Sequence, residues 1–271
     1  FADTLGKAAG LTSLSLNQYE FNHEEVVIIA NAIKTNMTLT TLELTKIQFC
    51  DRHSHLTITE ALSLNTTIRS LYFTMSNIGM VYGISPVANI IRQNHTLTTI
   101  NLSANNITDT EASAIGDALK TNPTLTTINL SANNITDQGA IALAAALEKS
   151  SLHTLELRGN NIGNAGASAL AAALEKSRLH TLDLGINNIG YAGESALAAA
   201  LEKSSVTTFK YEGHFIDERG ITALAKAVIA REKSLDPLTI LGICNFESHL
   251  KRAKEMLRDE AVCLPSFTGS S

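Results

Sequence analysis

A short frame of residues recurs along almost the whole chain of 271 residues. The frame reads Leu-x-x-Leu-x-Leu-x-x-Asn-x-Ile, and the segments 97–109 and 125–137 are identical in sequence. A fixed period of this length indicates a repeat array, in which each unit buries its apolar face only by stacking on the next. The first apolar position recurs at spacings of 27 to 29 residues, at Leu11, Leu39, Ile68, Leu97, Leu125, Leu152, Leu179, Val206 and Leu235.

Each repeat contains two hydrophobic rhythms. The Leu-x-Leu core alternates with a period of two, which predicts a short strand. The second half, such as Gly166–Ser177, is rich in Ala and Leu at helical spacing, and Thr108 with Glu111 has the spacing of a capping box at a helix start. Because a helix is wider than the spacing of about 4.8 Å between strands, the stack must curve. We therefore predict an α/β fold, a curved solenoid with parallel strands on the concave side and helices on the convex side.

This pattern resembles the leucine-rich repeat proteins of the ribonuclease-inhibitor type, over about Leu11 to Ile243. Relatives of that type include ribonuclease inhibitors, sensor regions of NOD-like receptors, Ran GTPase-activating proteins and leucine-rich effectors of intracellular bacteria. The Asn-rich, nearly identical repeats look most like the bacterial group. The resemblance implies a horseshoe-shaped binding scaffold.

The period also suggests a division of the chain. Residues 1–10 are expected to be an N-terminal cap or its remnant, and 11–234 to hold eight repeats. A ninth strand near 235–240 and a capping helix near 246–260 are expected within 235–262, followed by a flexible tail at 263–271. A cap is needed because a terminal repeat otherwise exposes its apolar core.

Composition excludes several classes of protein. The three Cys residues are too few for a disulfide framework, and a net charge of −5 argues against a basic nucleic-acid-binding face. No run of about 18 uncharged apolar residues occurs, so no transmembrane helix and no membrane contact are predicted. The sequence also lacks the common hydrolase, metalloprotease, P-loop and dinucleotide-binding motifs. We expect a monomer without a cofactor, either cytoplasmic or, as a bacterial effector, secreted into a host cytosol.

One column of the repeat holds Asn where the strand turns outward. In proteins that this chain resembles, such an Asn bonds the backbone of the turn, and buried turns need those partners. The Asn column comprises Asn105, Asn133, Asn160 and Asn187. It is interrupted at Tyr19, Ile47, Ser76 and His214, where we expect less regular turns.

Two groups of residues have the chemistry of metal ligands. Cys50, Asp51, His53 and His55 lie in one short loop, which brings side chains together poorly, so a polar loop entering a helix is the simpler interpretation. His153 and His180 occupy the same position in adjacent repeats, where they replace the usual Thr. Two neighbouring imidazoles could bind a metal or sense pH, but an ordinary surface position is the simpler interpretation, and we assign no metal site.

The concave face carries the candidate protein-binding residues. Two of its columns vary strongly, although the frame around them stays constant. The charged candidates, called the concave charge cluster below, are Glu156, Arg158, Asp183, Lys210 and Glu212. Glu156 and Asp183 are expected to be lateral neighbours of like charge, which destabilises a sheet. A second candidate patch is Tyr72 with Met75, exposed apolar side chains of the kind enriched at interfaces. A polar surface whose charges compensate one another remains the alternative for the cluster.

These features predict a non-enzymatic module that binds another protein through its concave face. The more specific hypothesis is a translocated bacterial effector that acts on a host protein. One alternative is a GTPase-activating protein of the Ran type, although the acidic tail common in that family is absent. Another is a nuclease inhibitor, which the low Cys content disfavours.

Overall fold

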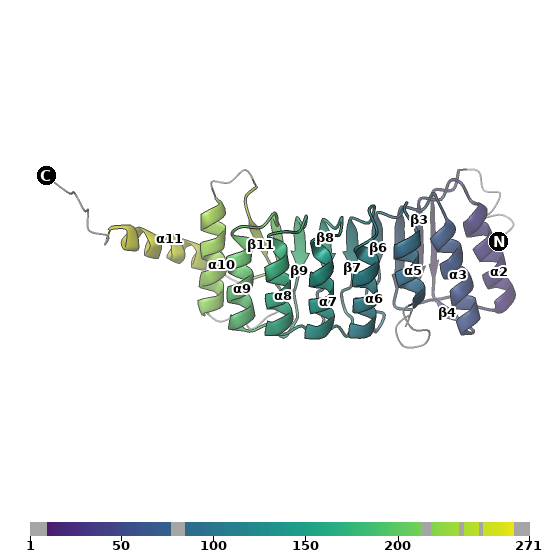
Figure 1. The fold of residues 1–271 in the computed structure, drawn as a ribbon, viewed down its shortest axis with the longest axis horizontal. Helices are drawn as coiled ribbons and strands as arrows, with labels where there is room; N and C mark the ends of the chain where they lie inside the picture. Colours follow the sequence, from purple (N-terminus) through teal and green to yellow (C-terminus); the bar gives the residue numbers. More distant parts are fainter. Residues whose placement is uncertain (1–9, 77–84, 213–217, 233–235, 244–245, 263–271) are drawn as a thin grey trace.

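Nine parallel strands form one continuous sheet, in the order in which they occur along the chain. The computed structural model describes residues 10–76, 85–212, 218–232, 236–243 and 246–262, and the side chains only up to 255. Strands and helices alternate and form two layers of one elongated stack (Figure 1). The strands are β1 (Ser13–Asn17), β3 (Thr41–Thr45), β5 (Ser70–Thr74), β6 (Thr99–Asn101), β7 (Thr127–Asn129), β8 (Thr154–Glu156), β9 (Thr181–Asp183), β10 (Thr208–Lys210) and β11 (Thr239–Leu241).

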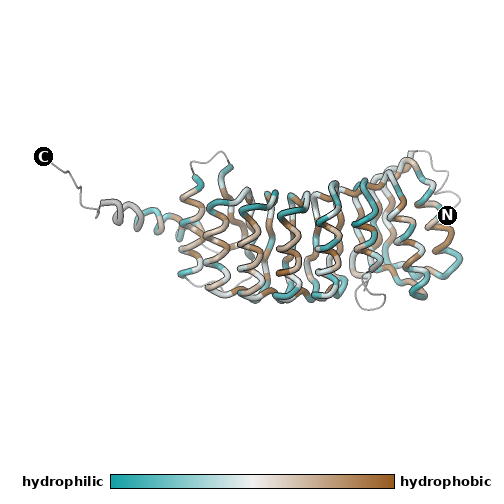
Figure 2. Tube along the Cα trace, viewed as in Figure 1, coloured by the Kyte–Doolittle hydropathy of each residue, from teal (hydrophilic) through white to brown (hydrophobic). Residues whose placement is uncertain are grey.

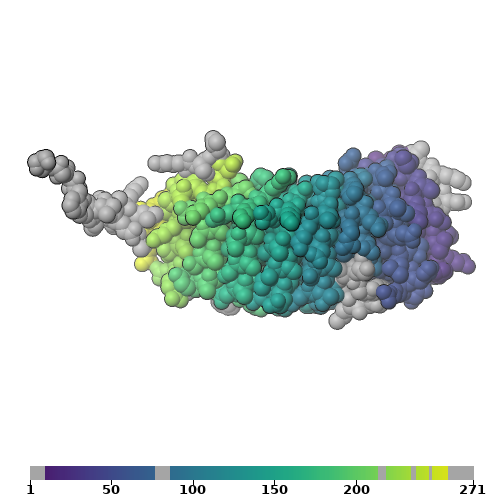
Figure 3. Space-filling model, in the orientation of Figure 1, coloured from purple at the N-terminus to yellow at the C-terminus, as the bar shows by residue number. Residues whose placement is uncertain are grey.

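The helices cover one face of this sheet, and each packs on the helix of the next repeat. They are α2 (His23–Thr35), α3 (Arg52–Leu64), α5 (Ser85–Gln93), α6 (Asp109–Leu119), α7 (Asp137–Leu147), α8 (Asn164–Leu174), α9 (Tyr191–Leu201), α10 (Glu218–Arg231) and α11 (Phe246–Val262). Two short strands, β2 (Glu20–Phe21) and β4 (Gln48–Phe49), form a separate parallel pair. The predicted curved α/β solenoid is confirmed, and its helical face is a continuous surface along the stack (Figure 3).

The core lies between the two layers. Neighbouring strands pair without any shift of the repeat, as in Ile100 opposite Ile128. The inward Leu residues are therefore stacked in columns, and Leu157 and Leu184 are fully buried. The apolar positions recur from one unit to the next along the whole stack (Figure 2). Each unit buries its apolar side chains against its neighbours, as a repeat array requires.

The predicted Asn ladder is present. Asn133 donates from Nδ2 to the carbonyl oxygens of Leu102 and Leu130, at 3.1 and 2.9 Å, and its Oδ1 accepts from the backbone N–H of Ile107 at 2.9 Å. At the interruption at Ser76, the hydroxyl oxygen accepts from Ile47 N–H at 3.0 Å, so a Ser continues the ladder. The interruption predicted at His214 lies outside the described residues.

A second ladder, which the sequence analysis missed, closes the helix C-terminal ends. It is built from Asn36, Asn65, Asn94 and Asn122, all buried. Asn122, for example, donates to the carbonyl oxygens of Ile91 and Asn94, in the preceding repeat, and accepts from Leu125 N–H at 2.7 Å. Near the C-terminal end of α10 the buried guanidinium of Arg231 donates to the carbonyls of Leu201 and Val206. The two ladders satisfy buried turn groups on both sides of the core.

The last helix is longer than expected and projects from the end of the stack (Figure 1). Its first part packs on α10, with Ala253 buried and Leu250 half-buried. The third expected core residue, Leu257, lies outside the side chains that are described. The ninth strand occupies Thr239–Leu241, whereas it was expected to start near Leu235. The division of the chain into cap, repeats and tail stays a prediction.

Candidate functional site

The concave charge cluster lies on three consecutive strands and the turns that follow them. Glu156 on β8, Asp183 on β9 and Lys210 on β10 are in register, so their Cα atoms form one lateral row. Arg158 and Glu212 follow β8 and β10. The structure therefore brings all five predicted residues of the cluster together.

An ion pair crosses the middle strand of this row. Lys210 Nζ lies 3.0 Å from Glu156 Oε1, although the two residues belong to repeats that are not adjacent. The other carboxylate oxygen of Glu156 accepts from Asn129 Nδ2 at 2.7 Å. Glu156 is thus held from both sides, and Lys210 supplies positive charge next to the two lateral carboxylates.

Asp183 corrects one expectation of the sequence analysis. Its place in a solvent-facing column predicted a solvated side chain, but it is only 6% exposed. Its Oδ1 accepts from Gly185 N–H at 2.9 Å. Burial raises the pKa of this carboxyl above its ordinary value, against the lowering effect of that hydrogen bond and of Lys210 and Arg158, while Glu156 adds to the rise. Asp183 is therefore covered by the other residues of the cluster and offers a partner little surface.

A second ion pair crosses the chain just after β9. Arg158 Nη1 lies 2.7 Å from Glu212 Oε2. Between them lies Gly185, where an added Cβ would come within 3.0 Å of Arg158 Nη1 and of the Glu212 carbonyl oxygen. Because Gly185 has no side chain, the Arg158 guanidinium has room to pass over it and reach Glu212. Gly185 was not among the predicted site residues. A signal was nevertheless visible in the sequence, because the adjacent repeats carry Arg158 and Glu212 at the position that Gly185 occupies.

The second candidate patch is separate from the first. Tyr72 is on β5 and Met75 follows it, so β6 and β7 lie between this patch and the cluster. Met75 is 53% exposed in a left-handed conformation with φ 53°, whereas Tyr72 is half-buried, which corrects the expectation that both are exposed. The patch is consequently narrower than predicted.

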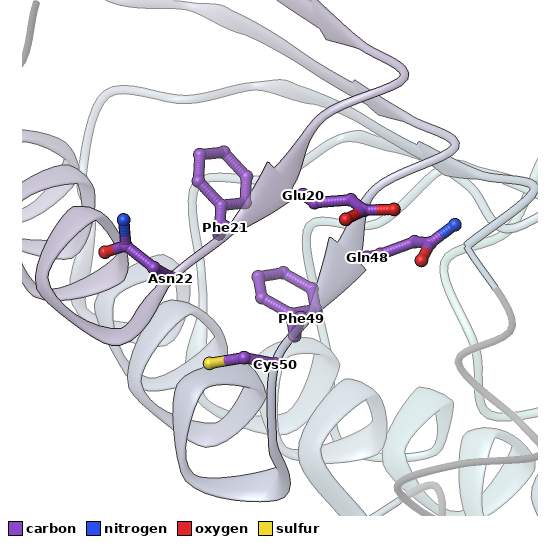
Figure 4. A pocket seen from close by; sticks show the side chains of 6 residues that line it. All are labelled: Glu20, Phe21, Asn22, Gln48, Phe49 and Cys50. Atoms are coloured by element: carbon purple, nitrogen blue, oxygen red, sulfur yellow. The ribbon is translucent and has the colours of Figure 1, made fainter.

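The loop proposed as a weak metal candidate does not gather its side chains. Asp51 caps α3 by accepting from Ser54 N–H at 2.6 Å, and Cys50 Sγ lies 3.2 Å from the Ser54 hydroxyl oxygen. Cys50 also lines a pocket of about 290 Å³ beside the stacked rings of Phe21 and Phe49 (Figure 4).

The two histidines of that loop lie in different environments. His55 is fully buried against Phe49 and Phe73, and burial lowers its pKa to about 4. His53 is exposed and stacks on His23. Within the described part of the chain, no group of three or more His, Cys, Asp or Glu residues could hold a metal ion. None of the described helices is both long enough and apolar enough to span a bilayer.

Comparison with known proteins agrees with this fold. A family model described as "Leucine Rich repeat" matches residues 93–116, 121–144 and 148–171. The structure of the leucine-rich repeat-containing protein LegL7 from Legionella pneumophila is 17% identical, with 83% of each chain covered and a TM-score of 0.54. An internalin (inlF) from Listeria monocytogenes is 18% identical, with 93% of this chain and 73% of that chain covered and a TM-score of 0.46. No curated protein sequence matches the chain. Three segments of the chain thus match a leucine-rich repeat model, and its fold is shared with LegL7.

Proposed function

We propose that this protein is a non-enzymatic module that binds another protein through the concave charge cluster. Its leucine-rich repeats indicate a protein-binding scaffold. The observation that carries the specific assignment is the two ion pairs, one across β9 and one across the turn just after it, because they place charged groups of both signs on a rigid sheet. Charges arranged in this way favour specificity and rapid association with a partner of complementary pattern.

The Arg158–Glu212 ion pair does little for the stability of the isolated protein. The side chains of Arg158 and Glu212 are 34% and 61% exposed, and such exposed pairs contribute about 0–1 kcal/mol. A partner can therefore exchange this bond for one of its own at small cost. We propose that Arg158, Lys210, Glu156 and Glu212 make the contacts and that Asp183 and Gly185 position them. Tyr72 and Met75 form a peripheral apolar contact in this proposal.

The finer version of the proposal is a bacterial effector that engages a host protein in the host cytosol. It rests on the Asn-rich, nearly identical repeats, which look most like those of bacterial effectors. A GTPase assay separates this proposal from the alternative of a GTPase-activating protein, because a pure binding module leaves the hydrolysis rate of its partner unchanged. Proximity labelling in host cells, with an unrelated leucine-rich repeat protein as control, supplies the partner.

A charge exchange then tests the binding face. The double variant Arg158→Glu with Glu212→Arg keeps an ion pair across Gly185 but reverses both charges that face a partner. We expect an almost unchanged melting temperature and binding weakened by more than about tenfold, which corresponds to about 1.4 kcal/mol. The matched control is Lys34→Glu with Glu60→Lys, which reverses an inter-helix pair of 3.5 Å on the convex face.

The comparison of the two exchanges decides the assignment. Binding that is lost only in the concave exchange supports the proposal. Should the convex exchange weaken binding and the concave one leave it intact, the protein binds through its helical face and the site assigned here is wrong. Because the interaction is electrostatic, the concave exchange should also slow association more at low salt than at high salt.

A further inference from the structure

Two histidines stand next to each other at the edge where β8 and β9 begin. His153 and His180 precede these strands at equivalent positions, and both are exposed. In neighbouring repeats the same position holds a Thr whose hydroxyl donates to the backbone of the preceding repeat, as Thr126 does to the Thr98 carbonyl at 3.1 Å. The imidazoles form no hydrogen bond or ion pair with any described residue; their recorded contact is with each other. Packing therefore does not explain why His replaces Thr at these two positions.

The spacing of the two rings is that of two ligands of one ion. The ring centroids are 5.1 Å apart and the ring planes meet at 78°. A zinc ion lies about 2.0–2.1 Å from a ligating imidazole nitrogen, so that two rings at a tetrahedral angle around it have centroids about 5.2 Å apart. Both residues directly precede strands that the sheet holds in register, so little ordering is needed for binding.

We propose that His153 and His180 form a two-ligand site for a divalent late transition-metal ion of the zinc and copper class. Neutral imidazole is a preferred ligand of these ions. Since no third His, Cys, Asp or Glu joins the pair among the described residues, water completes the coordination in the isolated protein. The site is independent of the concave charge cluster and of the proposed function.

Zinc titration calorimetry near neutral pH, in a buffer that does not chelate metals, tests the proposal. The informative variants are His153→Thr and His180→Thr, because Thr is the residue that most other repeats carry at this position. We expect each single variant to bind zinc at this site at least about tenfold more weakly, since even the loss of a residue that only supports a metal ligand costs 10–100-fold. The double variant should bind one zinc ion fewer than the unaltered protein.

The matched control is the other exposed histidine pair, His23 and His53. Its centroids lie 5.3 Å apart, but its rings are stacked at 30°. Replacing both by Ala removes as many imidazoles and should leave the site at His153 and His180 intact. Unchanged stoichiometry in the double Thr variant would overturn the proposal.

A second measurement needs no substitution. Zinc should slow the chemical modification of His153 and His180 by diethyl pyrocarbonate, read for each residue by mass spectrometry. Protection of both histidines at the same zinc concentration supports one shared ion. If zinc protects neither, or only one, the two imidazoles do not hold an ion together.

Discussion

Replacing Asn160 by Ala should destabilise the protein, whereas the same change at the neighbouring Asn161 should not. Asn160 is 6% exposed and makes three hydrogen bonds to backbone groups. Its Nδ2 donates to the carbonyls of Leu130 and Leu157 at 3.0 and 2.9 Å, and its Oδ1 accepts from Ile135 N–H at 3.0 Å. Asn161 is exposed, and its backbone N–H donates to the carbonyl oxygen of Ile135. This bond does not involve the Asn161 side chain.

The size of the effect follows from which groups lose their partners. The Leu130 carbonyl keeps a bond from Asn133 and the Leu157 carbonyl keeps one from Asn187. Ile135 N–H, in a fully buried residue, loses its side-chain acceptor. An unsatisfied buried donor costs about 1–3 kcal/mol. This corresponds to a fall in melting temperature of roughly 2–12 °C for a chain of this size, against less than about 0.5 kcal/mol for Asn161→Ala.

Urea and thermal unfolding of both variants, followed by circular dichroism, measure this difference. Equal destabilisation by Asn160→Ala and Asn161→Ala would show that the register of the repeat, and the role given to the ladder, are wrong.

Three further predictions concern single side chains in the same repeats. Leu157→Ala should lower the free energy of unfolding by about 2–5 kcal/mol, because burial is lost and a cavity is left. Hydrogen exchange should become faster in the adjacent repeats as well, and an effect confined to one repeat would contradict nearest-neighbour stacking. The raised pKa of Asp183 means that its contribution to stability is most favourable below its ordinary pKa of 3.8 and is lost as the pH rises through the raised value. Asp183→Asn should thus flatten that part of the pH–stability curve without loss of stability at neutral pH, and an unfolding series across mild acid checks this. Ile186 is a β-branched residue at φ 48° and is 47% exposed, so Ile186→Gly should raise the unfolding free energy by about 1 kcal/mol; a loss of stability would show that its backbone is not strained.

The candidate site was only partly predictable from the sequence. Register alone places Glu156, Asp183 and Lys210 in one row, because equivalent positions of consecutive repeats must be neighbours. The pairing of Glu156 with Lys210 does not follow from register, since it joins repeats that are not adjacent. It depends on a long side chain reaching across the strand between them.

The repeating part of this protein can be predicted from the sequence. A frame of 27 to 29 residues specifies which Leu side chains point inward and where the strands and helices fall. The resemblance to leucine-rich repeat proteins implied that Asn160 and its equivalents bond the turns. These features repeat because each depends only on local periodicity and on contact with the next unit.

The tertiary structure decided what happens where the side chains depart from the period. It buries Asp183 in a column expected to be solvated, leads the Arg158 guanidinium over Gly185, and sends His55 into an aromatic core away from Cys50. The burial of a side chain and the direction of a long one depend on the space left by neighbours in the adjacent repeats. That space exists only once the repeats are stacked.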